Sequence, residues 1–250
     1  MKKVIIIMAF LFGFNLVSKA DEGMWLPLLI NKNIVEMQDL GLKLSAEDIY
    51  SVNQSSLKDA IVIFGRGCTG EIVSPEGLLL TNHHCGYGSI QKVSTPAENH
   101  LQNGFWATNK KEEIPIDGLT VKFLIKMEDV SADALKGVTA DMTENERKKL
   151  VDKNSKKLIE KATKETHYNA IVESFFGGNE YYLFVYETFK DVRLTGTPPE
   201  SIGKFGADTD NWMWPRHTGD FSIFRVYSGT DGKPAEYSEN NVPLKPKHYL

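Results

Sequence analysis

The sequence predicts a mainly β fold, with short helices near its N-terminus and a helical insertion at about residues 131–175. Three features predict it. Short runs rich in β-branched and aromatic residues alternate with turns that contain glycine or proline. Residues 21–60 instead carry apolar side chains about three positions apart, which is a helical spacing. A lysine-rich segment that begins with the capping box Thr143–Glu146 interrupts the β pattern.

The first twenty residues read as a secretory signal and not as part of the fold. Lys2 and Lys3 precede an apolar run from Val4 to Val17, and small residues stand before a cleavage point after Ala20. An uncleaved anchor helix is the alternative, but the run is shorter than the roughly 20 residues that a span needs. We therefore expect residues 21–250 to form the mature part of the chain, exported from the cytoplasm.

The expected elements follow in chain order. A capping-box variant at Ser45–Asp48 opens a short helix before the first strand. A Ser-Pro-Glu-Gly turn at 74–77 joins two strands into a hairpin, because proline fixes φ and glycine permits the conformation that follows. The predicted strands are Ile61–Phe64, Cys68–Val73, Leu78–Asn82, Leu119–Met127, Tyr181–Phe189, Asp191–Leu194 and Phe221–Tyr227. The helix after Thr143 has one apolar stripe, which favours a solvated helix packed on one side over a basic interaction surface.

Composition excludes several classes of function. The chain has 33 acidic and 29 basic side chains, without the basic excess of a nucleic-acid-binding protein. After the signal, no apolar stretch is long enough to span a membrane. We expect no cofactor. We also expect no metal at His83, His84 and Cys85, because adjacent strand residues point to opposite faces and further ligands at suitable spacing are missing.

The two cysteines, Cys68 and Cys85, suggest a disulfide in an exported protein. Two free thiols are the alternative. A loop of about 17 residues closed by this bond would contribute about 3 kcal/mol by the chain-entropy model.

The strand-like run that ends in His83, His84 and Cys85 carries the clearest chemical signal. A histidine just before a half-cystine, at the edge of a β-barrel, is how chymotrypsin-like enzymes hold their general base. Such a base needs a carboxylate on its other nitrogen, and Asp220 stands in the expected order at the start of an apolar strand. We therefore predict His84 as the base and Asp220 as its partner. His83 would face the other way.

The nucleophile is missing from this pattern. No Gly-x-Ser-x-Gly segment occurs in the 250 residues. Ser89 follows His84 by only five residues, and Ser222 follows Asp220 by two on the same strand. Neither offers a sharp turn with free backbone amides, so we expect the serine to lie beyond Leu250.

Four segments resemble the bacterial dipeptidyl-peptidases of the 7/11 type, which are exported serine exopeptidases with a chymotrypsin-like double β-barrel and a large helical domain. The segments are Glu22–Trp25, Phe64–Glu71, Thr81–Tyr87 and Asn211–Phe221. The resemblance implies that residues 21–250 are the N-terminal part of the catalytic domain, with the first barrel. The second barrel, with the serine, would lie outside this chain.

Specific roles also follow from the resemblance. His84 and Asp220 match the catalytic histidine and aspartate. Asn211 and Trp212 match residues that hold the free α-amino group of the substrate. The residue types suit this role, because an amide oxygen can accept a hydrogen bond from an ammonium group and the face of an indole attracts a cation. Aromatic core is the alternative for Trp212 and Trp214. The family also implies a homodimer.

The predicted function is release of dipeptides from the free N-terminus of peptides, in the periplasm or at the cell surface. These 250 residues alone would be inactive, because the nucleophile is missing. A trypsin-like endopeptidase is the nearest enzymatic alternative and would lack the clamp for the amino group. A non-catalytic half-enzyme or a peptide-binding β-barrel domain is the alternative of another class.

Overall fold

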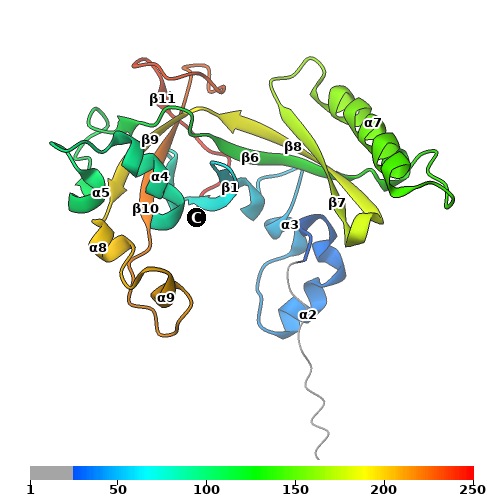
Figure 1. Cartoon of the computed structure of the whole chain (residues 1–250), viewed down its shortest axis with the longest axis horizontal. Coiled ribbons are helices and arrows are strands. Elements are labelled where there is room, and N and C mark those ends of the chain that lie inside the picture. Colours follow the sequence, from blue (N-terminus) through cyan, green and yellow to red (C-terminus); the bar gives the residue numbers. More distant parts are fainter. Residues whose placement is uncertain (1–24) are drawn as a thin grey trace, which may run out of the picture.

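The computed structural model describes residues 25–250 (Figure 1). The predicted signal segment, residues 1–20, and most of the Glu22–Trp25 motif lie outside the described residues. Among residues 25–250, no helix combines the length and the apolar character needed to cross a bilayer.

The N-terminal part is helical, as predicted. It contains the elements η1 (Pro27–Lys32), α2 (Ile34–Asp39), α3 (Ala46–Ile49) and η2 (Leu57–Asp59). The predicted capping box is confirmed at α3, where the hydroxyl of Ser45 accepts from the backbone N–H of Asp48 and the Asp48 carboxylate accepts from the backbone N–H of Ser45.

The centre of the fold is one antiparallel sheet, which confirms the mainly β prediction. Its main path runs in the order β4-β9-β10-β3-β2-β1-β6-β8-β7, with β5 paired to β9 and β11 to β10. The strands are β1 (Ile61–Phe64), β2 (Cys68–Ile72), β3 (Leu78–Thr81), β4 (Phe105–Trp106), β5 (Ile114–Pro115), β6 (Val121–Asp129), β7 (Asn169–Phe175), β8 (Glu180–Phe189), β9 (Asp191–Thr197), β10 (Ser222–Ser228) and β11 (Val242–Pro243).

The hairpin predicted around residues 74–77 is confirmed. β2 pairs with β3 in a register that places Ile72 opposite Leu79. Both side chains are fully buried, together with Val121, Leu194 and Phe224 from neighbouring strands. One face of these strands therefore builds the main core, as the alternation of apolar and polar side chains requires.

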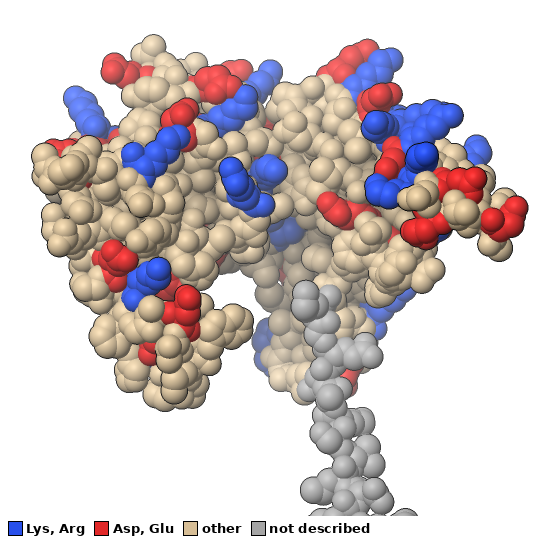
Figure 2. Space-filling model, in the orientation of Figure 1, with Lys and Arg blue, Asp and Glu red and all other residues tan. Residues whose placement is uncertain are grey.

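The predicted insertion at 131–175 is only partly helical. It contains α6 (Ser131–Ala134), α7 (Glu144–Thr163) and then strand β7, which pairs with β8 along its whole length. The prediction of a helical region up to residue 175 was therefore wrong for β7. This edge strand buries little, and its polar residues conceal the β pattern. α7 packs one apolar stripe on β7 and β8, and charges of both signs cover its outer side (Figure 2).

A short 3-10 helix, η3 (Phe176–Gly178), connects β7 to β8. The remaining α-helices gather at the other end of the sheet, around β9 and β10 (Figure 1). They are α4 (His83–Val93), α5 (His100–Asn103), α8 (Glu200–Gly203) and α9 (Ala207–Asn211). Below the sheet, the surface is hollowed between this group and the N-terminal helices (Figure 2).

Candidate active site

His83, His84 and Cys85 lie in the first turn of α4 and not at the end of a strand, which corrects the prediction. β3 ends at Thr81, and Asn82 caps the helix with an extended backbone. The helix forms here because His83, Gly86 and Ile90 are buried on one face at helical spacing.

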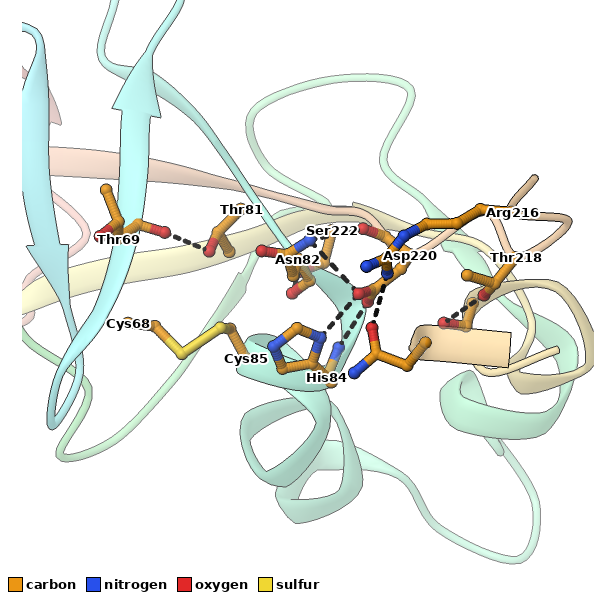
Figure 3. A network of polar contacts seen from close by, with 12 residues as sticks. Cys68, Thr69, Thr81, Asn82, His84, Cys85, Arg216, Thr218, Asp220 and Ser222 are labelled. Carbon is orange, nitrogen blue, oxygen red and sulfur yellow. Dashed lines mark hydrogen bonds and ion pairs between the residues drawn. A yellow bond between two sulfur atoms is a disulfide. The ribbon is translucent and has the colours of Figure 1, made fainter. Parts of the chain in front are cut away.

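The disulfide predicted between Cys68 and Cys85 is present, with a Cα–Cα distance of 6.0 Å (Figure 3). It joins the first turn of α4 to the start of β2. The start of α4 is held on a second side by Ser222, whose buried hydroxyl donates to the carbonyl of Asn82 at 2.9 Å. Two strands therefore fix the position of the helix that carries the histidines.

Sheet pairing brings His84 and Asp220 together. β10 pairs with β3 so that Ser222 lies opposite Thr81, which places the residue before β10 beside the residue after β3. Nδ1 of His84 lies 2.6 Å from Oδ2 of Asp220, and the backbone N–H of His84 donates to Oδ1 at 2.9 Å (Figure 3). The sequence separation of 136 residues gives no local indication of this contact.

The hydrogen bonds define the state of the imidazole. The side chain of Asp220 is 13% exposed and that of His84 is 53% exposed. Asn82 donates from Nδ2 to the Asp220 carbonyl at 3.1 Å and to Oδ2 at 3.3 Å. An ionised carboxylate only accepts, so Nδ1 of His84 carries the proton. Nε2 is then the nitrogen that can accept a proton from another group, as a general base requires.

The serines near this pair have other positions. The hydroxyl of Ser222 donates its hydrogen bond to the carbonyl of Asn82, as described above. Ser89 follows His84 by five residues on the same helix, so its side chain points about 140° away around the helix axis.

Asn211 and Trp212 lie at the end of α9, on the chain segment that leads into Asp220. Oδ1 of Asn211 accepts from Nη1 of Arg216 at 2.8 Å. Trp212 is 86% exposed, and Trp214 is exposed to a similar extent. Among residues 25–250, both indoles therefore lie outside the core and are available for contacts with other groups.

His83 lies beside the site, although no role was predicted for it. It is fully buried, and its Nδ1 lies 3.1 Å from the hydroxyl of Thr197. Burial lowers the pKa of His83 below its ordinary value, which keeps the ring neutral at neutral pH. A helical reading of residues 83–90 would have revealed its burial, because His83 shares a face with Gly86 and Ile90.

Comparison with known proteins gives a consistent family. The family model described as Peptidase S46 matches residues 20–250. Dipeptidyl-peptidase 7 of Capnocytophaga gingivalis is 50% identical over 100% of this chain and 35% of the relative. The Asp/Glu-specific dipeptidyl-peptidase of the same organism is 53% identical over 97% of this chain and 34% of the relative. The chain thus spans about a third of the length of these curated relatives.

A solved structure matches as well. The crystal structure of Porphyromonas endodontalis DPP11 in complex with the dipeptide Arg-Glu is 47% identical, with a TM-score of 0.85. The match covers 92% of this chain and 34% of that chain. It confirms the predicted fold class, the first part of a chymotrypsin-like double-barrel peptidase.

Proposed function

The chain belongs to the peptidase S46 family, and we propose that it supplies the general base and the amino-group clamp of a serine dipeptidyl-peptidase. This enzyme would release dipeptides from the free N-terminus of peptides. The relatives named dipeptidyl-peptidases support the proposal, as do the solved DPP11 complexes with dipeptides. The observation that carries it is the His84–Asp220 pair, with Nδ1 engaged and Nε2 able to accept a proton.

The proposed reaction transfers the acyl group of the substrate to a serine. This serine would belong to a C-terminal region outside these 250 residues. Nε2 of His84 takes the proton of the serine hydroxyl as the oxygen attacks the carbonyl carbon of the second residue. Asp220 stabilises the imidazolium that forms. The imidazolium then donates its proton to the leaving amine, and the C–N bond breaks. Water then attacks the acyl-enzyme, and His84 again takes a proton, now from the water, and gives it to the serine oxygen as the ester bond breaks. This step releases the dipeptide.

The count of two residues would come from Asn211 and Trp212. The carboxamide oxygen of Asn211 has a second lone pair beside the one used by Arg216, so it can accept from the substrate ammonium. The exposed indole of Trp212 can add cation–π attraction. A peptide anchored at its amino group would always place the peptide bond after its second residue near the base.

We propose that residues outside this chain determine which side chain is preferred at the second position of the substrate. The relatives named Asp/Glu-specific dipeptidyl-peptidase and dipeptidyl-peptidase 7 match this chain with nearly equal identity, at 53% and 50%. We infer that the shared third of the molecule carries the base and the clamp, and that the pocket for the second side chain is built by the remaining two-thirds.

Export and dimerisation are part of the same proposal. The basic and apolar residues 2–17 have the pattern of a secretory signal. The Cys68–Cys85 disulfide supports an oxidising compartment, such as the periplasm or the cell surface. The homodimer implied by the family resemblance stays a prediction, which the sedimentation of the purified protein can test.

The test compares two histidine–carboxylate pairs in the full-length peptidase, meaning these residues joined to the proposed C-terminal region. His84→Ala should lower kcat about 10³-fold or more, because the base is lost. His167→Ala is the matched control, since Nε2 of His167 also lies 2.6 Å from a carboxylate oxygen, that of Glu187. Equal activity of the two variants would refute the assignment of the base.

Acetylation of the substrate separates the remaining functions. A dipeptidyl-peptidase should cleave a peptide with a free amino group and lose this activity when the amino group is acetylated. A trypsin-like endopeptidase would cleave both peptides. A full-length protein that binds the free peptide without cleaving it would be a peptide-binding domain, and the proposed enzymatic function would be wrong.

A further inference from the structure

Two consecutive histidines of α4 contact the two ends of one loop. We define the clamp loop as residues 203–220, which include Asn211 and Trp212. His84 binds its last residue, Asp220, and His83 lies against its first residue, Gly203. The first contact belongs to the site described above, whereas the second has no part in the proposed chemistry.

The contact between His83 and Gly203 is close. A Cβ atom added at Gly203 would lie 2.5 Å from Nδ1 of His83 and 2.8 Å from Cδ2. The backbone of α8 therefore rests directly on the imidazole, and only glycine permits this approach. Because the ring is fully buried, neither partner has free space into which it can move.

A hydrogen-bond chain fixes the orientation of the His83 ring. The hydroxyl of Thr197 donates to the carbonyl of Pro198 at 3.1 Å, so it accepts from Nδ1 of His83. Thr197 ends β9, three residues before Glu200, the first residue of α8. The ring thus binds the chain just before α8 and packs on the last residue of α8.

A second contact one turn along α4 holds the same helix. The hydroxyl of Tyr87 donates to Oε1 of Glu200 at 3.1 Å, and Tyr87 packs edge-on against His83. The ammonium of Lys204 lies 5.1 Å from the centre of the Tyr87 ring. α4 therefore contacts the first residue of α8, Glu200, through Tyr87 and the last residue, Gly203, through the buried ring of His83.

Hydrogen bonds of the clamp loop connect α8 to the segment that carries Asn211 and Trp212. The carbonyl of Ile202 accepts from the hydroxyl of Thr218 at 3.1 Å and from the N–H of Gly219 at 3.0 Å. Oδ2 of Asp210, in α9, accepts from the N–H groups of His217 and Thr218. A displacement of α8 would therefore move both the end of α9 and the approach to Asp220.

We propose that His83 is a positioning residue that sets the distance between the base and the amino-group clamp. Its imidazole acts as the spacer on which α8 rests, so it fixes where Asn211 and Trp212 lie relative to His84. The inference rests on the proposed function, in which this distance decides how many residues are removed. His83 itself touches neither substrate nor proton in the reaction.

The test uses four variants of the full-length peptidase. His83→Ala removes the spacer. His83→Asn retains a donor at the position of Nδ1, whereas His83→Gln places its amide nearer to the position of Nε2. Ile90→Ala is the matched control, because Ile90 is also fully buried on α4 but packs in the main core of the sheet. All four are compared with the unaltered protein.

Two measurements decide the inference. Hydrogen–deuterium exchange of residues 205–219 should be about tenfold faster in His83→Ala than in the unaltered protein, and unchanged in Ile90→Ala. KM for a peptide with a free amino group should rise roughly tenfold, with kcat changed less than about threefold, because binding geometry is lost while the base is intact. His83→Asn should restore KM more fully than His83→Gln.

Unchanged exchange of the clamp loop in His83→Ala would overturn the inference, whatever the kinetics. Faster exchange without a rise in KM would also overturn it, as would an equal rise in KM in Ile90→Ala. Failure of the proposed function is distinguishable, because then the unaltered protein itself would not release dipeptides. The exchange measurement does not depend on catalysis.

Discussion

Asp220→Asn tests the electrostatic half of the proposed site with the smallest change in shape. The carboxylate of Asp220 uses both of its oxygens on His84. Oδ2 lies 2.6 Å from Nδ1, and Oδ1 accepts the backbone N–H at 2.9 Å. Asn82 adds a weaker donor to Oδ2 at 3.3 Å. Each of these hydrogen-bond partners of the carboxylate is a donor.

An asparagine has only one oxygen for these donors. If its NH₂ group faces the backbone N–H of His84, one hydrogen bond is lost at a largely buried position. This costs about 1–3 kcal/mol of stability. If the NH₂ group faces Nδ1 instead, the imidazole must carry its proton on Nε2 and can no longer accept one. Both orientations also remove the negative charge that stabilises the imidazolium.

We therefore expect kcat/KM of the full-length Asp220→Asn variant to fall about 10³- to 10⁴-fold, since loss of this carboxylate from a Ser-His-Asp triad costs about 10⁴ in kcat. KM should change little, because Asn211 and Trp212 are intact. Glu187→Gln is the matched control, since it makes the same chemical change beside His167 at the same 2.6 Å distance. The assay is release of a dipeptide from a free-amino substrate, with the melting temperature measured in parallel.

A folded Asp220→Asn variant with kcat/KM within tenfold of the unaltered protein would refute the reasoning. So would a loss of equal size in Glu187→Gln. Nitrogen chemical shifts of His84 give an independent check. They should report the proton on Nδ1 in the unaltered protein and a larger share on Nε2 in the variant.

The remaining predictions concern stability. Replacing Cys68 and Cys85 together by serine should lower the free energy of unfolding by about 3 kcal/mol, because the disulfide closes a loop of 17 residues; denaturant unfolding measures this, and an unchanged midpoint would contradict it. Burial lowers the pKa of His83, outweighing the opposite effects of Asp220 and Glu200. The unfolded chain therefore binds this proton at higher pH, so the contribution is present above about pH 6.5 and is lost as the pH falls below it. Between pH 7.5 and 5.5, the melting temperature of His83→Asn should therefore fall less than that of the unaltered protein. An equal fall in both proteins would show that His83 does not cause the pH dependence of stability.

The parts of the fold that depend on local patterns were predicted from the sequence. The β2–β3 hairpin was visible because the turn chemistry at Pro75 and Gly77 and the apolar run of Leu78–Thr81 agree with each other. The capping box of α7 was visible for the same reason, since its hydrogen bonds join residues three apart. Such signals do not require knowledge of the tertiary structure.

The errors occurred where tertiary contacts decide the structure. β7 has a mixed sequence and becomes a strand because β8 offers it a complete edge. The apolar Ile171 lies on its exposed side, between Asn169 and Glu173, so the alternation is weak. The start of α4 follows a strand without a glycine or proline to separate them, and its helical face is defined by what Gly86 and Ile90 pack against. Neither contact can be read from neighbouring residues.

The helical backbone of α4 determines which neighbours His83 and His84 can share. On a strand, the two rings would point to opposite faces of the sheet and could not share a neighbour. On a helix they diverge by about 100°, so both can reach the same loop from one side. His84 reaches Asp220 at the end of the clamp loop and remains half exposed, whereas His83 is buried against Gly203 at its beginning. The helical turn is therefore what allows one residue to act on the substrate while its neighbour holds the loop that binds it.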